Sequence, residues 1–514
     1  MGDTMANNHH ELSRRTFLGA AGSMAAIPVL SGVLVNCAAL HETTLHKTMK
    51  VKPMNIDQAI QQNLEDYIHQ GIFPIIQAEA VSKKKSPEQM SPVAEKVRGI
   101  MAQYGIENLQ ILQEAGSYPA VYGEVRSPNP HAPTILIQGH YDGQPSDPKK
   151  WTKTKPHEPK VIPESGERRI YGRGSSDDWG QVMTHLAAVD VHQKSGTPLP
   201  ANVKFLIEGG EERGSIDMDK LILKYKNLLA CDVVMITDSA PGRENHSVIT
   251  TMTRGLVAAY VTLQAGTNNP HSGENLALNA VAQLAVLLTS MKDYQHNQIL
   301  IPGFYDAVHA LNSAERAKFT AMPFDTNLFK REYGLKDIIT EQGYSAQETM
   351  WARPSFEIHT IIGGEKVNSI PTHAEAYITM RLVPHQNPQS ILELFTKGLY
   401  QRAAQFHLTA TQLTITPEAL ASPFSTTTEH PAFKAAERAM EAAFSSSVDY
   451  LGCGGTEPIA VYHQQILKVP VIFNAYNSPR DHYHGNDESF SIENSFLPGI
   501  KANVLFYRNM TEVR

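Results

Sequence analysis

Short apolar runs that end in polar residues are the feature that most restricts how this chain can fold. They occur in the segments PTILIQGHYD, NVKFLIEGG and CDVVMITDSA, and the helical segment DDWGQVMTHLAAVDVHQKSG separates the first two. A continuous apolar run bounded by turn residues is typical of a strand buried on both faces, as in a parallel sheet covered by helices. The pattern predicts an α/β fold with a mostly parallel sheet, in which ligands bind at the carboxyl ends of the strands.

The sequence pattern changes near Thr253 and changes back after the segment ASPFSTTTEHP. Between these points, RGLVAAYVTLQAG and AEAYITMRLVP alternate like half-exposed strands, and NLALNAVAQLAVLLTSM is a strongly apolar helix. A chain of 514 residues is too long for one ordinary core. We therefore predict an α/β domain built from residues 50–251 and 424–514, interrupted by an inserted α+β domain at residues 252–423.

The N-terminal segment SRRTFLGAAGSMAAIPVLSGVLV joins an arginine pair to an apolar stretch from Ala20 to Val35. This stretch is short for a membrane span, and the pattern resembles a twin-arginine export signal. We predict a leader at residues 1–40, an exported periplasmic or cell-envelope protein, and no transmembrane span in the mature chain. Cys37 is a candidate lipid anchor. The alternative is a disordered tail that carries a chance arginine pair.

The overall charge and the cysteines exclude some classes of protein. The formal net charge of −7 is modest for the length, so nucleic acid is not an expected partner. Beyond Cys37 only Cys231 and Cys453 remain, which is too few for a disulfide framework. We expect two ordinary thiols, although an oxidising compartment would allow one bridge between them.

Histidine and carboxylate side chains gather at the predicted carboxyl edge of the sheet. Imidazole nitrogens with carboxylate oxygens suit zinc, manganese or cobalt better than copper or an iron–sulfur cluster. Each residue alone has an ordinary structural interpretation, such as a helix cap for Asp177 or a solvated turn for the glutamate pair. The full set is His140, Asp142, Asp177, Glu211, Glu212, Asp238 and His484.

In their order along the chain, these motifs resemble the dinuclear metallopeptidase family of carnosinase, carboxypeptidase G, acetylornithine deacetylase and succinyl-diaminopimelate desuccinylase. The motifs are GHYD, GRGSSDDWG, EGGEERGS, a later strand-end Asp238 and a C-terminal His484. The resemblance covers roughly residues 60–510. GHYDGQPSD, RLVP, CGGTEP and MWARPSFEIHTIIGGE are most similar to the carnosinase, or cytosolic dipeptidase, branch.

The resemblance implies two divalent metal ions, zinc above all, in the domain that carries these motifs. Asp177 would bridge the two ions. His140 and Asp238 would complete one site, and Glu212 and His484 the other. Asp142 would hydrogen-bond the imidazole of His140 and fix its tautomer.

The neighbouring glutamates would then have different roles. Glu212 would bind metal, and Glu211 would act as the general base. Adjacent residues of a turning backbone point in different directions, so one can bind metal while the other faces the attacking water. The two ions would lower the pKa of a bridging water, and Glu211 would pass its proton to the leaving amine.

By the same resemblance, the inserted domain is a lid and dimerisation domain. His271 would reach into the partner subunit's active site and stabilise the oxyanion, which implies a homodimer. Arg381 would hold the substrate carboxylate. Further residues expected to line the substrate pocket are Asn368, Gly454, Gly455 and Thr456.

Two positions depart from the family pattern. Trp179 stands where many relatives have lysine, and HGNDES follows the last histidine where relatives often read His-x-x-Asn-Glu. Neither departure removes a ligand, so we expect an active enzyme.

The expected activity is hydrolysis of dipeptides or short peptides with a free C-terminal carboxylate. An N-acyl-amino-acid amidohydrolase is the close alternative, because the same residues can cut any amide beside a carboxylate. A binding protein that kept only the fold is a third hypothesis. It predicts a missing ligand or base, and the sequence contains them all.

Overall fold

The computed structural model describes residues 55–513 apart from residues 115, 165, 240–241 and 366. The predicted leader at residues 1–40, with its apolar stretch and Cys37, lies outside the described residues. Within the described part of the chain, no helix is both long enough and apolar enough to cross a bilayer.

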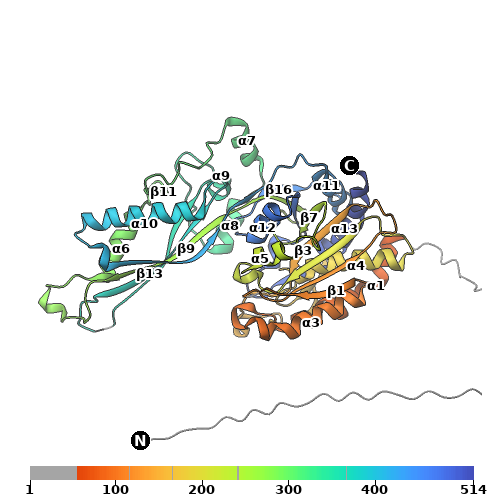
Figure 1. Ribbon diagram of the computed structural model, residues 1–514, viewed down its shortest axis with the longest axis horizontal. Helices are drawn as coiled ribbons and strands as arrows, with labels where there is room; N and C mark the ends of the chain where they lie inside the picture. Colours follow the sequence, from red (N-terminus) through yellow and green to blue (C-terminus); the bar gives the residue numbers. More distant parts are fainter. Residues whose placement is uncertain (1–54, 115, 165, 240–241, 366, 514) are drawn as a thin grey trace, which may run out of the picture. The chain divides into compact units, whose positions relative to one another are not determined.

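A nine-stranded sheet carries the predicted strand-end residues, and its four middle strands, β6, β3, β7 and β17, run parallel (Figure 1). The strands towards both edges pair mostly antiparallel. The predicted α/β class is therefore confirmed, with the parallel pairing concentrated in the middle of the sheet. The strands of this sheet are β1 (Glu107–Leu112), β2 (Ala120–Val125), β3 (Thr134–His140), β6 (Asn202–Glu208), β7 (Val233–Ile236), β8 (Val248–Thr253), β15 (Phe424–Ser425), β16 (Asp449–Gly452) and β17 (Val471–Ala475).

Both faces of β3 are buried, as its continuous apolar run predicts. Ile135 and Ile137 belong to a core that includes Leu186 of α4. Leu136 points to the opposite face, where it belongs to a second core with Leu221 of α5. Alternate side chains of a strand point to opposite faces, so a strand between two helical layers needs apolar residues at every position.

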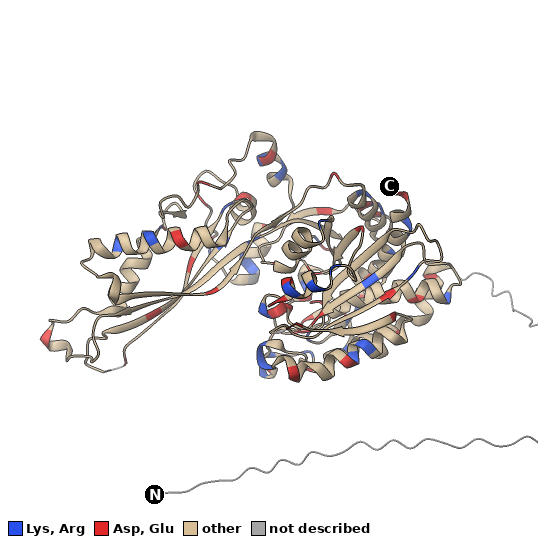
Figure 2. Cartoon of the chain, viewed as in Figure 1, with Lys and Arg blue, Asp and Glu red and all other residues tan. Residues whose placement is uncertain are grey.

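Helices cover the two faces of this sheet. The first core contains side chains from α1 (Ile56–Asp66), α3 (Pro87–Gln103), α4 (Trp179–Lys194), α11 (Pro431–Phe444) and α13 (Leu497–Asn509). The second contains side chains from α5 (Met218–Lys224) and α12 (Pro458–Ile466). Charges of both signs are interspersed along α3 (Figure 2), as expected for a helix with one solvent-exposed face.

A second, antiparallel sheet of four strands has the order β12-β13-β9-β14. Its strands are β9 (Gly255–Gln264), β12 (Ser355–Ile362), β13 (His373–Leu382) and β14 (Leu413–Ala421). Burial alternates along β13, and the buried side chains pack against α6 (Ala280–Thr289) and α10 (Pro388–Gln405). Both helices lie beside this sheet in Figure 1. This is the α+β pattern predicted for the inserted segment.

The remaining α-helices and β-strands are short. They are α2 (Phe73–Ile76), β4 (Lys160–Glu164), β5 (Glu167–Tyr171), β10 (Lys292–Asp293), β11 (Gln298–Ile299), α7 (Ser313–Ala321), α8 (Thr326–Tyr333), α9 (Ala346–Ala352) and β18 (Ser489–Ser491). Residues 52–514 form one compact unit. The domain boundaries at residues 251/252 and 423/424 therefore stay predictions.

Candidate metal centre

The predicted ligands come from separate elements that meet at the carboxyl edge of the parallel strands. β3 ends at His140, and Asp238 follows β7 by two residues. Glu211 and Glu212 begin the short helix η4 (Glu211–Arg213) after β6. The register pairs His140 with Glu208, the last residue of β6, so the two strands end at the same level of the sheet. Parallel pairing thus brings distant parts of the sequence to one site.

The first group of possible metal ligands is His140, Asp177 and Asp238. The His140 Nε2 atom lies 3.1 Å from Asp177 Oδ1 and 3.3 Å from Asp238 Oδ2. One nitrogen or oxygen atom from each residue lies within 4.8 Å of the others. His140 and Asp177 are buried, and Asp238 is partly exposed. This donor set fits a borderline-hard divalent ion.

The second group is Asp177, Glu212 and His484. The His484 Nε2 atom lies 2.9 Å from Asp177 Oδ2 and 3.3 Å from Glu212 Oε2. The two oxygens of Asp177 therefore face different histidines, Oδ1 towards His140 and Oδ2 towards His484. A carboxylate placed in this way can bridge two ions, as predicted for Asp177.

The electrostatics of the second group favour a bound cation. Burial opposes ionisation of Asp177, but hydrogen bonds with His140 and His484 hold the pKa of its carboxyl group well below its usual range. Burial and the charge of Asp177 raise the pKa of Glu212 to about 7. Burial lowers the pKa of His484, but hydrogen bonds to Asp177 and Glu212 outweigh it and raise the pKa to about 11. The carboxylates thus stabilise positive charge between them.

A buried carboxylate oxygen in the second group also supports a metal site. Glu212 Oε1 is buried without a hydrogen-bond partner among the described residues. A buried carboxylate oxygen without a partner is costly, and a metal ion would satisfy it. The residues present therefore fit two divalent ions that share Asp177.

Asp142 contacts both His140 and the turn that contains Glu211 and Glu212. The ring nitrogen Nδ1 of His140 lies 2.9 Å from the main-chain oxygen of Asp142 and 3.4 Å from its carboxylate Oδ1. The carboxylate itself accepts hydrogen bonds from the backbone N–H groups of Glu211 and Glu212, at 3.2 and 3.3 Å. It also accepts a hydrogen bond from the hydroxyl of Ser82. The Asp142 backbone thus orients the imidazole, and its carboxylate holds the glutamate turn.

Glu488 holds the loop that presents Asp177. Its buried carboxylate accepts hydrogen bonds from the N–H groups of Gly174, Ser176 and Asp177 at 3.0–3.1 Å. It also pairs with the guanidinium of Arg173 at 2.6 Å. Glu488 was not among the predicted site residues, because nothing in the HGNDES motif distinguishes its role from that of Asp487.

Trp179, the first departure from the family pattern, has a structural role here. It begins α4 and is buried in the first core, and its Nε1–H donates a hydrogen bond to the carbonyl oxygen of Gly71 at 2.9 Å.

The peptide bond between Asp177 and Asp178 is cis. Asp178 accepts a hydrogen bond from the backbone N–H of His140 at 3.0 Å.

A third acidic group includes Glu457, which was not among the predicted site residues. Oxygens of Glu211, Asp238 and Glu457 lie within 4.8 Å of one another. Burial and the neighbouring Glu457 raise the pKa of Glu211 well above its usual range. No local signal in CGGTEP predicted that Glu457 would reach the site.

The predicted substrate-binding residues fall into two places. Arg381 of β13 donates a hydrogen bond to the hydroxyl of Thr456, and the neighbouring Gly455 carbonyl accepts one from the Arg254 backbone at 2.7 Å. The structure therefore brings Arg381 to the loop that contains Gly454, Gly455 and Thr456. No carboxylate in the described ranges forms a salt bridge with Arg381.

His271 and Asn368 lie together in a different place. His271 and Ser369 form an isolated β-bridge, and the Ser272 N–H donates a hydrogen bond to the Asn368 carbonyl at 2.9 Å. Both His271 and Asn368 are exposed. No contact within the described part of this chain joins His271 to the metal-ligand groups.

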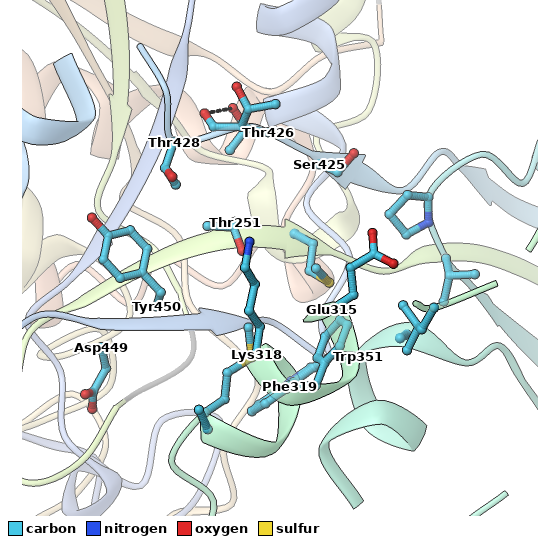
Figure 3. Close-up of a pocket in the computed structure, with 18 of the residues that line it drawn as sticks. Thr251, Glu315, Lys318, Phe319, Trp351, Ser425, Thr426, Thr428, Asp449 and Tyr450 are labelled. Atoms are coloured by element: carbon cyan, nitrogen blue, oxygen red, sulfur yellow. Dashed lines mark hydrogen bonds between the residues drawn. The ribbon is translucent and has the colours of Figure 1, made fainter. Parts of the chain in front are cut away.

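No disulfide joins Cys231 to Cys453. A cavity of about 880 Å³ lies beside β8 and β16, where Thr251, Lys318, Phe319 and Trp351 form part of its lining (Figure 3). None of the metal-ligand residues lines this cavity. The candidate active site is therefore at the metal-ligand groups and not in this cavity.

Two donor groups that share one carboxylate, at the carboxyl edge of an α/β sheet, define a metal-dependent hydrolase. The chain belongs to the peptidase family M20/M25/M40, whose family model matches residues 136–509. It is therefore a metallopeptidase of this family, as the sequence motifs predicted.

Two curated relatives and one solved structure are similar over most of the chain. The human Beta-Ala-His dipeptidase is 27% identical over 404 residues, which cover 77% of this chain and 78% of the relative. The cysteinylglycine-S-conjugate dipeptidase of Corynebacterium striatum is 30% identical, with 71% and 78% covered. The solved dipeptidase Dug1p of Saccharomyces cerevisiae has a TM-score of 0.78 at 23% identity, with 89% and 98% covered, and shares the fold.

The comparisons contradict the predicted export to the periplasm or cell envelope. The relatives matched along most of the chain include dipeptidases from human and from S. cerevisiae. Eukaryotic cells have no bacterial periplasm, so these relatives give no support to a periplasmic enzyme. That predicted localisation is wrong, and the leader from which it was inferred lies outside the described residues.

Proposed function

We propose that this metallopeptidase is a dipeptidase that hydrolyses the amide bond of dipeptides or short peptides with a free C-terminal carboxylate. The pair of donor groups sharing Asp177 carries the proposal. The relatives support it, because their names specify β-Ala-His and cysteinylglycine conjugates as substrates. The N-acyl-amino-acid alternative is not favoured by these relatives.

In this proposal, His140, Asp177 and Asp238 hold one divalent ion, and Asp177, Glu212 and His484 hold the other. Their nitrogen and oxygen donors suit zinc, and also manganese or cobalt. When bound, two such ions supply an activated water and polarise the scissile carbonyl. Glu488 and Asp142 keep the ligand loops in place through their backbone hydrogen bonds.

Glu211 is the proposed general base. Its carboxylate accepts a proton from the attacking water and donates it to the nitrogen of the leaving amine. The position of Glu211 supports this role, because its Oε2 atom lies 3.8 Å from His140 Nε2 and it belongs to neither group that contains Asp177. General acid–base catalysis of this kind contributes roughly 10²- to 10⁴-fold in rate.

Arg381 is the proposed partner of the substrate carboxylate. A guanidinium group can bind a carboxylate through two parallel hydrogen bonds. The hydrogen bond from Arg381 to Thr456 fixes one end of the guanidinium, and the absence of a salt bridge to any described carboxylate leaves the charge for the substrate. Gly454 and Gly455 would allow the substrate to approach the backbone closely.

We also propose that the enzyme is a homodimer in which His271 stabilises the oxyanion in its partner's site, with Asn368 beside it. The exposure of both residues supports this arrangement. Mixing of inactive Glu211→Gln and His271→Ala dimers tests it, because each mixed dimer regains one complete site. Random exchange should restore about a quarter of the wild-type sites. Dimers that exchange subunits without regaining activity would refute a role across the interface.

The catalytic proposal is tested with chelator-stripped protein reloaded with zinc or manganese. Release of amino acids is measured on matched panels of dipeptides and N-acetyl amino acids. Metal-dependent cleavage confined to the dipeptides is the expected result. Cleavage of the acetylated panel alone would replace the dipeptidase with a deacylase.

The two proposed domains correspond to the two sheets. Residues 50–251 and 424–514 would form the catalytic domain, and residues 252–423 the lid and dimerisation domain. The separate hydrophobic cores of the two sheets support this division. Expression of residues 252–423 alone, followed by a measurement of its secondary structure and oligomeric state, tests whether this segment folds independently.

A further inference from the structure

The carboxylate of Glu457 points away from the helix that it begins. Glu457 is the N-cap residue of α12, but its side chain makes no capping hydrogen bond. The side chain is half-buried, and its Oε2 atom is fully buried without a hydrogen-bond partner among the described residues. Aspartate, asparagine, serine and threonine are the usual N-caps. Helix capping therefore does not explain a glutamate here.

Glu457 instead faces two other carboxylates. Its oxygen lies within 4.8 Å of oxygens of Glu211 and Asp238. No lysine or arginine in the described ranges forms a salt bridge with Glu457. Carboxylates this close repel one another, so their grouping costs free energy unless a cation is held between them.

Two divalent ions do not fully compensate this negative charge. Asp177, Glu212 and Asp238 are proposed ligands, and Glu211 is the proposed base. With the neighbouring carboxylate of Asp142, these groups carry five negative charges, one more than the four positive charges of two ions, the histidines being neutral. Glu457 adds a further carboxylate, which belongs to neither donor group that shares Asp177. It lies on the side of the cluster formed by Glu211 and Asp238.

A positive charge, that of Arg381 on β13, lies beside the loop that contains Glu457. Thr456, the residue before Glu457, accepts the hydrogen bond from Arg381. Arg381 and Glu457 form no salt bridge with each other, so cation and anion remain apart. A dipeptide carries an ammonium group at one end and a carboxylate at the other. A cationic group and an anionic group in one site match that charge distribution.

We propose that Glu457 binds the free ammonium group of the substrate and so restricts the enzyme to unblocked dipeptides. The inference rests on the dipeptidase proposal and extends it, because it names the residue that separates dipeptides from N-acyl amino acids. An acylated nitrogen carries no positive charge, so it would leave the charge of Glu457 uncompensated.

The test compares Glu457→Gln with wild type by calorimetry on zinc-loaded protein. The two probes are a ketomethylene analogue of alanyl-alanine and its counterpart with hydrogen in place of the amino group. Wild type should bind the amine more tightly by about 10- to 100-fold, the value of a hydrogen bond between charged groups. Glu457→Gln should lose this preference and keep its affinity for the counterpart and its two zinc ions.

Two further variants complete the design. Glu457→Asp keeps the charge on a shorter side chain and should retain part of the preference. Glu107→Gln makes the same chemical change at an exposed position on the edge strand β1 and should behave as wild type. An unchanged preference in Glu457→Gln would overturn the assignment. Loss of zinc from that variant would also overturn it, because Glu457 would then be a metal ligand.

Failure of the assignment is distinguishable from failure of the dipeptidase proposal. Wild type that cleaves dipeptides but binds both probes equally refutes only the role of Glu457. Wild type that binds neither probe and cleaves no dipeptide refutes the function on which that role rests.

Discussion

Replacement of Glu488 by glutamine should loosen the loop that presents Asp177. The carboxylate accepts hydrogen bonds from three backbone N–H groups and pairs with Arg173, whose side chain is 3% exposed. Glutamine is nearly the same size, but it places an N–H₂ group where one oxygen accepted hydrogen bonds. The guanidinium of Arg173 then loses its charged partner while it stays buried. Breaking a buried ion pair in this way costs about 3–5 kcal/mol.

The position of Asp177 should change as well, because its own N–H is one of the groups that Glu488 holds. Loss of a residue that supports a metal ligand typically weakens metal binding by roughly 10- to 100-fold. The free energy of unfolding is measured by urea denaturation of the metal-free protein. The zinc affinity is measured separately by competition with a chromophoric chelator.

Glu493→Gln provides the matched control. Glu493 pairs with Arg168 at 2.9 Å, but the two side chains are 35% and 39% exposed. An exposed pair of this kind contributes at most about 1 kcal/mol. Equal, small losses of stability in both variants, with unchanged zinc affinity, would refute the role assigned to Glu488.

Three further predictions concern the site and the core. Glu211→Gln should keep two metal ions by elemental analysis and lose about 10²- to 10⁴-fold in kcat; loss of metal would instead make Glu211 a ligand. Glu212→Ala should bind less metal and lose activity, and unchanged metal content would remove Glu212 from the ligand set. Burial lowers the pKa of His185 to about 3. The unfolded state therefore binds a proton that the folded state rejects, and stability should fall by about 1.4 kcal/mol per unit as pH drops from roughly 6 to 4. The same urea titration of His185→Gln should show a shallower fall, and an identical slope would contradict the depressed pKa.

The strand-end residues were predictable because their signal is local. An apolar run followed at once by His140 or Asp238 identifies a buried strand and its carboxyl end without knowledge of the partner strands. The motifs around Asp177 and the glutamate pair are equally compact. Glu488 and Glu457 were missed because their partners are distant in the sequence. Glu488 acts on a loop more than 300 residues earlier, and Glu457 reaches Glu211 only through the packing of α12.

The sequence by itself determined the α/β class, the family and the set of residues able to hold metal, because each depends on residue types in short segments. Only the tertiary structure decided which oxygen of Asp177 faces which histidine, what fixes the Asp177 loop, and where Glu457 points. Distances between side chains depend on strand order, register and helix packing, which long-range contacts set. A local pattern predicts that a residue can take part in a site, and the packed fold decides what it touches there.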